Sequence, residues 1–187
     1  DMDMIAGLAP QANIHDYEVD MNSANNGGDA WSLLNDTFQQ IINDNSSNTS
    51  SASVVSVSLG GAESGITSSD IAALDQSFKV LSQVEHMTVL VSSGDCAAYA
   101  DGAYNDLSVS YPASDPYNVG VGGTVLTVDG QGTRSQEVAW SDGTNTSQCS
   151  NAWGSGGGLS TLFSKPSWQA ANGVDNQYSN GQRQVPD

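Results

Sequence analysis

Two short apolar runs, separated by a helical pattern, place the strongest constraint on the fold of this chain. Residues 54–59 and 87–91 are rich in β-branched and other apolar side chains, which is typical of buried parallel strands. Between them, apolar side chains recur at helical spacing. These are Ile71, Leu74, Phe78 and Leu81. We expect Ser68, Ser69 and Asp70 to supply the N-cap chemistry of this helix. The order strand, helix, strand predicts a parallel sheet with crossover helices.

The same alternation continues on both sides of this unit. We expect Asp29 to open another helix with one apolar face. That face consists of Trp31, Leu34, Phe38 and Ile41. Strands are predicted at 117–121 and 124–128, and the turn Asp129-Gly130 leads the second strand into a hairpin with 137–140. The predicted fold class is α/β, a parallel sheet with helices on both faces.

The remaining segments are assigned from composition. Residues 1–8 are expected to form the end of a helix that stops at Pro10, and 12–19 are predicted to be a strand. A loop is predicted around Asn25–Gly28, and the Asn- and Ser-rich tract 43–53 is predicted to be loop.

The charge balance limits the partners of the protein. The chain carries 21 Asp and Glu residues against 4 Lys and Arg residues, a formal net charge of -17. Nucleic acids and anionic lipids bind to basic surfaces, so neither is an expected partner. No apolar run approaches eighteen residues, so no membrane span is predicted. The acidic excess favours either solubility in general or tolerance of acid, where carboxylates are protonated and few basic groups remain to repel one another.

The cysteines and the glycosylation sequons leave alternatives open. Cys96 and Cys149 form a disulfide in an oxidising compartment or remain two buried thiols in a reducing one. The sequence Asn-x-Ser/Thr permits glycosylation but arises easily in a chain rich in Asn and Ser. It occurs at Asn35, Asn45, Asn48 and Asn145.

Several common catalytic sets are missing. A Ser-His-Asp hydrolase needs a histidine that accepts the proton of the serine. The only histidines are His15, in the predicted strand 12–19, and His86, before the strand 87–91. We expect a partly buried structural role for His15 and a helix-end position for His86. The chain also has no Cys/His metal cluster, no phosphate-binding Gly-rich loop and no Asp-Thr-Gly or Asp-Ser-Gly loop.

A series of motifs in a defined order resembles a known family. They are Val57–Gly60, Val91–Asp95, Tyr111–Tyr117, Val119–Thr124, Gly156–Ser160 and Arg183–Asp187. The first resembles the substrate-pairing strand of subtilisin-like peptidases. The second resembles the strand that carries their oxyanion-hole residue, with Asp95 where subtilisins have Asn. The whole series is similar to that of the sedolisins, the serine-carboxyl peptidases, and implies a subtilisin-like parallel α/β fold.

The resemblance implies a catalytic role for Asp1. Sedolisins use Ser, Glu and Asp, and the Glu and Asp lie four residues apart on one helix. That spacing puts both carboxylates on one helix face, where they can share a proton. The catalytic Asp of the family precedes a Pro by nine residues, as Asp1 precedes Pro10. The Glu would then lie one turn before Asp1. Asp3 is a rival for the role, and an ordinary helix-start Asp is the structural alternative.

Asp95 corresponds to the oxyanion-hole Asp of the family. A donor is needed there, and an ionised carboxylate only accepts hydrogen bonds. A free Asp titrates at about 3.9, so the neutral, donating acid is most abundant at low pH. The substitution of Asp for Asn therefore predicts a peptidase that works in acid. The structural alternative is that Asp95 caps a loop or the next helix.

The resemblance also implies substrate-binding residues. The backbones of Ser58 and Gly60 would pair with an extended substrate as an added strand. The structural alternative is a strand that ends at a glycine. Leu59 stands where many sedolisins have Trp.

Other parts of the family pattern are expected outside these residues. The nucleophile, in a Gly-Thr-Ser motif, would follow Asp187, and Ser160 does not match it. Residues 1–187 would thus be a partial peptidase domain, truncated at both ends and inactive alone. Calcium is expected in the full-length protein, with no ligand in this chain. The resemblance further implies an N-terminal pro-segment, protein or peptide substrates, secretion into an acidic environment and a monomer.

Two other functions compete with the acid peptidase. An ordinary subtilisin-type protease would need a histidine in the first helix, and none is present. An inactive sedolisin homologue that acts as a secreted binding protein is the alternative from a different class.

Overall fold

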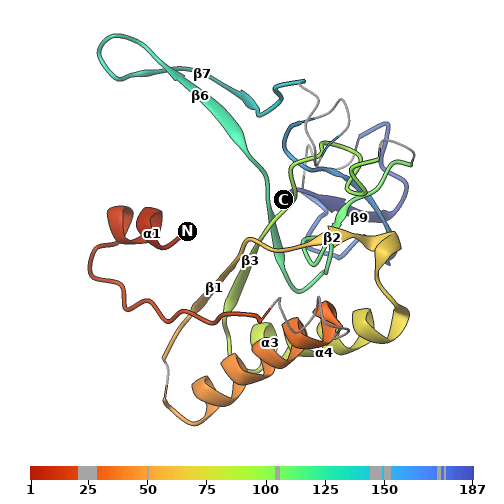
Figure 1. Ribbon diagram of the computed structural model, residues 1–187. Helices are drawn as coiled ribbons and strands as arrows, with labels where there is room; N and C mark the ends of the chain where they lie inside the picture. Colours follow the sequence, from red (N-terminus) through yellow and green to blue (C-terminus); the bar gives the residue numbers. More distant parts are fainter. Residues whose placement is uncertain are drawn as a thin grey trace. The chain divides into compact units, whose positions relative to one another are not determined.

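The computed structural model describes residues 1–20, 29–49, 51–103, 106–143, 149, 153–171, 174 and 176–187. The chain divides into two compact units (Figure 1). The first comprises residues 1–58 and 67–89, and the second comprises 59–66 and 90–187. The predicted loop Asn25–Gly28 and the sequon at Asn145 lie outside the described residues.

The two long helices of the first unit begin at a side chain that caps them. The described helices of this unit are α1 (Met2–Leu8), α3 (Ala30–Ser46) and α4 (Ser68–Gln83). The predicted start of α3 is confirmed, because Asp29 accepts a hydrogen bond from the backbone N–H of Trp31 at 3.0 Å. The cap of α4 is Thr67, which accepts from the N–H of Asp70, and not one of the three residues that follow it. Capping requires a non-helical backbone, and that conformation falls at Thr67.

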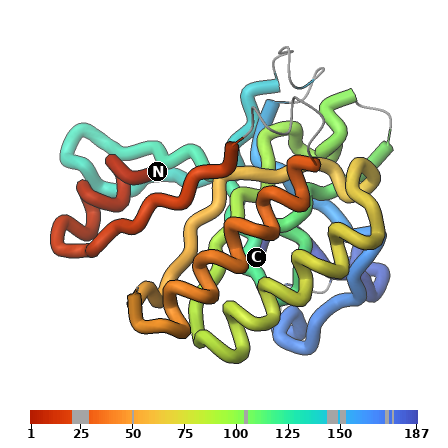
Figure 2. The backbone as a smooth tube through the Cα atoms, turned by 60° about the horizontal axis from the view of Figure 1, so that its bottom comes forward, coloured from red at the N-terminus to blue at the C-terminus, as the bar shows by residue number. Residues whose placement is uncertain are grey.

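Helices α3 and α4 lie side by side (Figures 1 and 2). The rings of Phe38 and Phe78 meet edge to face, with centroids 4.7 Å apart. The predicted apolar faces are confirmed at their centres, where the side chains are buried. These are Leu34, Phe38 and Ile41 of α3, and Leu74, Phe78 and Leu81 of α4. Burial of these faces against each other is the main force that holds the helix pair together.

The central sheet has the strand order β1-β3-β5. Its strands are β1 (Val54–Val57), β3 (Thr88–Ser92) and β5 (Val119–Val121). Strands β3 and β5 are parallel, with Leu90 opposite Val119. Val89 and Val91 of β3 are buried, as predicted, but Val54 of β1 is 53% exposed. The predicted parallel α/β arrangement is therefore present, although β1 is less buried than its composition suggests.

Two predicted segments of the first unit are wrong. Residues 12–19 form no strand, and the segment is mostly exposed. A strand-like composition is not enough, because a strand also needs a neighbour that pairs with its backbone. The predicted loop 43–53 is helical up to Ser46. The hydrogen bonds of Asn45 and Ser46 to Glu85, at 2.8 and 2.7 Å, stabilise this last turn of α3 through contacts distant in sequence.

The second unit consists mainly of antiparallel strand pairs. The long hairpin of β6 (Thr124–Val128) and β7 (Arg134–Ala139) is confirmed, although β7 begins earlier than predicted. Figure 1 shows this hairpin extending from the rest of its unit. Five further elements of this unit that the structure describes were not predicted. They are β2 (Gly61–Ala62), the 3-10 turn η1 (Glu63–Gly65), β4 (Ser110–Tyr111), β8 (Gly158–Ser164) and β9 (Gln182–Val185).

Buried polar side chains hold the strands of the second unit. Arg183 of β9 is fully buried, and its guanidinium is held by the carboxylate of Asp187 at 2.6 and 2.7 Å. Glu63 of η1 is also buried, and its carboxylate accepts hydrogen bonds from Ser160 Oγ and from the backbone and hydroxyl of Thr161. Such charges are tolerated in the interior because each has well-placed partners.

None of the helices that the structure describes combines the length and the apolar character that a membrane crossing requires.

Candidate active site

The Asp95 turn follows directly on strand β3. Ser93, one residue after the strand, is buried, and Gly94 has a φ of +97°. That conformation favours glycine. A side chain at Gly94 would also lie 2.5 Å from Ser110 Oγ. The next residue, Asp95, is exposed. The chain thus turns sharply at the carboxyl end of a parallel strand and presents a carboxyl group to solvent.

The backbone around Asp95 is bonded to residues 154–157, which we call the glycine strap. The N–H of Gly154 donates to the carbonyl of Asp95 at 2.8 Å, and the N–H of Gly156 donates to the carbonyl of Gly94 at 2.7 Å. Ala97 continues the pairing, since its N–H donates to the carbonyl of Gly154 at 3.1 Å and its carbonyl accepts from Gly157 at 3.0 Å. Gly156 and Gly157 belong to the motif Gly156–Ser160 of the family series, but their contact with the Asp95 turn was not predicted from the sequence.

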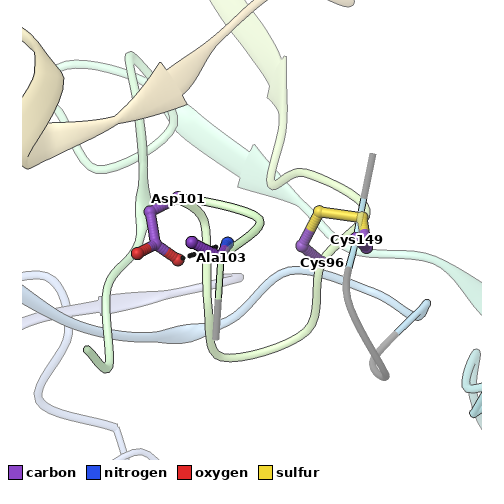
Figure 3. The surroundings of a disulfide bond; sticks show 4 residues. All are labelled: Cys96, Asp101, Ala103 and Cys149. Carbon is purple, nitrogen blue, oxygen red and sulfur yellow. Dashed lines mark hydrogen bonds between the residues drawn. A yellow bond between two sulfur atoms is a disulfide. The ribbon is translucent and has the colours of Figure 1, made fainter. Parts of the chain in front are cut away.

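A disulfide lies next to Asp95. Cys96 and Cys149 are bonded, with their Cα atoms 5.2 Å apart (Figure 3). The structure therefore decides between the two states that the sequence left open. Figure 3 also shows the loop beyond Cys96, where Asp101 accepts a hydrogen bond from the N–H of Ala103 at 3.1 Å.

Two of the predicted site residues meet in the first unit. The hydroxyl of Ser58 donates to Asp1 Oδ2 at 2.6 Å, and Ser56 approaches the same oxygen at 3.4 Å. Asp1 occupies the N-cap position of α1, but its side chain makes no capping hydrogen bond. Among the described residues, no hydrogen bond joins the rival Asp3 to Ser58. The side chain of Asp1 is thus turned toward the end of β1 and not toward its own helix.

The other two predicted site residues belong to the second unit. A side chain at Gly60 would lie 2.8 Å from the backbone oxygen of Tyr111, so only glycine fits there without a shift. Asp95 is the other predicted site residue of this unit. The predicted set therefore divides into the pair Asp1 and Ser58 in one unit and Gly60 and Asp95 in the other.

The remaining polar candidates are not arranged for catalysis. Ser160 is buried, and its hydroxyl donates to Glu63 at 2.6 Å. Both histidines are exposed, so the partly buried position predicted for His15 is wrong. His86 lies just beyond the C-cap of α4 at Val84, close to its predicted position. In the part of the chain that the structure describes, no group of three or more His, Cys, Asp or Glu side chains could hold a metal ion.

The fold has a close counterpart among solved structures. The Pseudomonas sedolisin described as a serine-carboxyl proteinase, in complex with two molecules of pseudo-iodotyrostatin, matches with a TM-score of 0.71 and 34% identity. The match covers 86% of this chain and 42% of that one. The parallel sheet, its helices and this match define a protein of the subtilisin-like α/β class.

Sequence comparison leads to the same group of proteins. The chain is 33% identical to sedolisin of Pseudomonas sp. (strain 101) over 159 residues and 35% identical to kumamolisin of Bacillus sp. (strain MN-32) over 139 residues. These matches cover 82% and 72% of this chain. Xanthomonalisin of Xanthomonas sp. (strain T-22) is 33% identical over 64% of the chain. The chain belongs to the sedolisin family.

These matches cover most of this chain but only a small part of each relative. The chain spans between 18% and 25% of the length of the curated relatives it matches. No protein-family model matches the chain.

Proposed function

We propose that the protein is a serine-type endopeptidase that acts in acid through an acyl-serine intermediate. The proposal is carried by Asp95, an exposed carboxyl group on a turn whose backbone is bonded to the glycine strap. The family membership supports it. Asp95 in its neutral form would serve in the oxyanion hole.

The chemistry explains why a carboxylic acid suits this place. Attack of a serine Oγ on the scissile carbonyl carbon forms the C–O bond and places negative charge on the carbonyl oxygen. A neutral carboxyl group donates its O–H to that oxygen, whereas an ionised one repels it. The donor is therefore present only where Asp95 holds its proton, and the reaction requires acid.

Asp1 would act one step earlier. The serine proton has to leave as the C–O bond forms, and we propose that a Glu one helical turn before Asp1 accepts it and later returns it to the leaving amine. Asp1 would share a proton with that Glu. The hydrogen bond from Ser58 is consistent with this role, because it holds Asp1 Oδ2 at 2.6 Å and the carboxylate makes no capping hydrogen bond to α1. Water would then hydrolyse the acyl-serine.

Substrate binding would use backbone groups. Ser58 and Gly60 follow the end of β1, where an extended peptide can add as a strand. Glycine at position 60 leaves room for the backbone oxygen of Tyr111, which would lie 2.8 Å from a Cβ there. The proposed substrates are proteins or peptides.

Other family properties are part of the same proposal. Secretion, an N-terminal pro-segment, a monomeric state and a calcium ion follow from the resemblance. The resemblance places the calcium ligands outside this chain, so no residue is assigned to calcium.

The test is the pH dependence of peptidase activity of the full-length gene product, compared with Asp95→Asn. We expect maximal activity in acid and an altered or abolished profile in the variant. Asp101→Asn is the matched control, because Asp101 is also exposed but caps a local turn.

Two other outcomes of this experiment would count against the proposed function. An optimum near neutral pH would contradict the proposal. No activity at any pH, with the flanking Glu and Ser present and the pro-segment removed, would favour an inactive homologue that acts as a secreted binding protein.

A further inference from the structure

The turn that carries Asp95 is tied to the rest of its unit at every residue from 93 to 97. Gly94, Asp95 and Ala97 are bonded to the glycine strap through their backbones. Cys96 is bonded to Cys149 through the disulfide. The remaining residue, Ser93, is tied through its side chain. Its hydroxyl donates to the carbonyl of Gly156 at 2.8 Å, across 63 positions of sequence.

The hydrogen bond of the Ser93 side chain is buried. Ser93 is only 2% exposed, so an unpaired hydroxyl or an unpaired carbonyl there would carry a desolvation cost. Its backbone N–H is bonded as well, to the carbonyl of Val121 in β5 at 2.9 Å. Ser93 therefore connects the parallel sheet on one side with the glycine strap on the other.

Gly156 completes this contact by its lack of a side chain. A Cβ at this position would collide with the backbone oxygen of Ser93 and lie 3.0 Å from that of Gly94. The strap can thus approach the turn only because residue 156 is glycine. The two backbones are held at a distance that no other residue type allows without a shift.

We infer that Ser93 and Gly156 form a clamp that positions Asp95, with Ser93 as a positioning residue that acts through Asp95. This inference rests on the proposed oxyanion role of Asp95. The backbone of Asp95 is held while its carboxyl group is exposed, so the clamp sets where the carboxyl can point. Oxyanion donors act by preorganisation, and a small displacement of such a group is costly.

The clamp has a distinct kinetic consequence. Loss of the Ser93 hydroxyl would leave the substrate-pairing backbone in place but loosen the oxyanion donor. In the full-length enzyme, we expect Ser93→Ala to lower kcat about ten- to hundredfold, with KM changed by less than about twofold. Ser92→Ala is the matched control, because Ser92 is the last residue of β3, directly before Ser93, and has no side-chain hydrogen bond to the strap among the described residues.

A double-mutant cycle separates positioning from a general structural effect. In an Asp95→Ala background, Ser93→Ala should cost less than about twofold in kcat, because the group that it positions is already gone. An equal loss of kcat in both backgrounds would overturn the inference. So would a Ser93→Ala variant that behaves like Ser92→Ala while the wild-type enzyme is active.

Hydrogen exchange of the wild-type protein tests the clamp without any variant. The amides of Gly154 and Gly156 should exchange more slowly than that of Gln131 in the exposed hairpin turn, whose N–H donates to the side chain of Asp129. Exchange at the same rate as Gln131 would show that the strap does not hold the turn and would overturn the inference. An inactive wild-type protein with a protected strap would instead count against the proposed function alone.

Discussion

The hydroxyl of Ser58 donates a hydrogen bond to Oδ2 of Asp1 at 2.6 Å, although 57 positions separate the two residues. This contact links the start of α1 with the residue after β1. It joins two residues to which the sequence assigns different tasks, proton sharing for Asp1 and backbone pairing with substrate for Ser58.

The first prediction concerns this contact. In the full-length enzyme, Ser58→Ala should lower kcat about two- to tenfold, the value of one ordinary hydrogen bond. KM should stay the same, because alanine keeps the backbone groups that pair with substrate. Steady-state kinetics in acid measures both constants. Ser56→Ala is the control, since Ser56 lies 3.4 Å from the same oxygen. Equal losses in the two variants would contradict a specific role of Ser58.

The second prediction concerns the buried ion pair of Arg183 and Asp187. The side chain of Arg183 is 0% exposed and that of Asp187 is 16% exposed. Asp187→Asn leaves the guanidinium without its counter-charge, so the free energy of unfolding should fall by about 3–5 kcal/mol. Urea denaturation followed by circular dichroism measures this change.

An exposed ion pair provides the control for that experiment. Arg134 and Glu137 of β7 lie 2.9 Å apart with side chains 65% and 35% exposed. Glu137→Gln should change the free energy of unfolding by less than about 1 kcal/mol. If Asp187→Asn has no larger effect than Glu137→Gln, the pair of Arg183 and Asp187 does not hold the unit together.

The third prediction concerns the pH dependence of the contact between Glu85 and the end of α3. Hydrogen bonds from Ser46 and then Asn45 hold the pKa of Glu85 below its ordinary value of 4.5. A lowered carboxyl pKa means that this stabilisation is present above the ordinary value and is lost as the pH falls through the lowered one. Glu85→Gln should therefore reduce the urea midpoint at neutral pH, and the difference from wild type should vanish in strong acid. A difference that persists unchanged in strong acid would exclude this explanation, and Glu18→Gln is the exposed control.

The fourth prediction concerns Asp75, whose pKa is shifted in the opposite direction to that of Glu85. Partial burial raises the pKa of Asp75 above its ordinary value of 3.8, although Lys79 one turn later on α4 works against the shift. A raised carboxyl pKa means that the stabilisation is complete below the ordinary value and is lost as the pH rises through the raised one. Asp75→Asn should therefore increase the thermal midpoint at neutral pH and have little effect in strong acid. A variant that is destabilised at neutral pH would show that the ionised carboxylate is favourable there.

Local patterns were sufficient for the helices and for the central strands. The spacing of Leu34, Phe38 and Ile41 predicted α3, because one buried face of a helix recurs at a period that can be counted along the chain. The same holds for α4 and for the buried strand β3. The start of α3 was also predictable, because capping by Asp29 involves only neighbouring residues.

Wrong or missing predictions involve partners that lie far away in sequence. Residues 12–19 have a strand-like composition but no paired strand among the described residues. The pairs β2–β4 and β8–β9 were not predicted, since two- to seven-residue strands carry little pattern of their own. The last turn of α3 depends on Glu85, which lies forty residues after Asn45.

The sequence by itself determined the alternation of helices and strands, the family resemblance and the place of Asp95 after a buried strand. Only the tertiary structure decided that Asp1 meets Ser58, that Cys96 and Cys149 are bonded, and that Ser93 binds the carbonyl of Gly156. The physical reason is the range of the interactions. Periodic burial and capping act within a few residues, whereas these contacts exist only after the folded backbone has brought distant segments together.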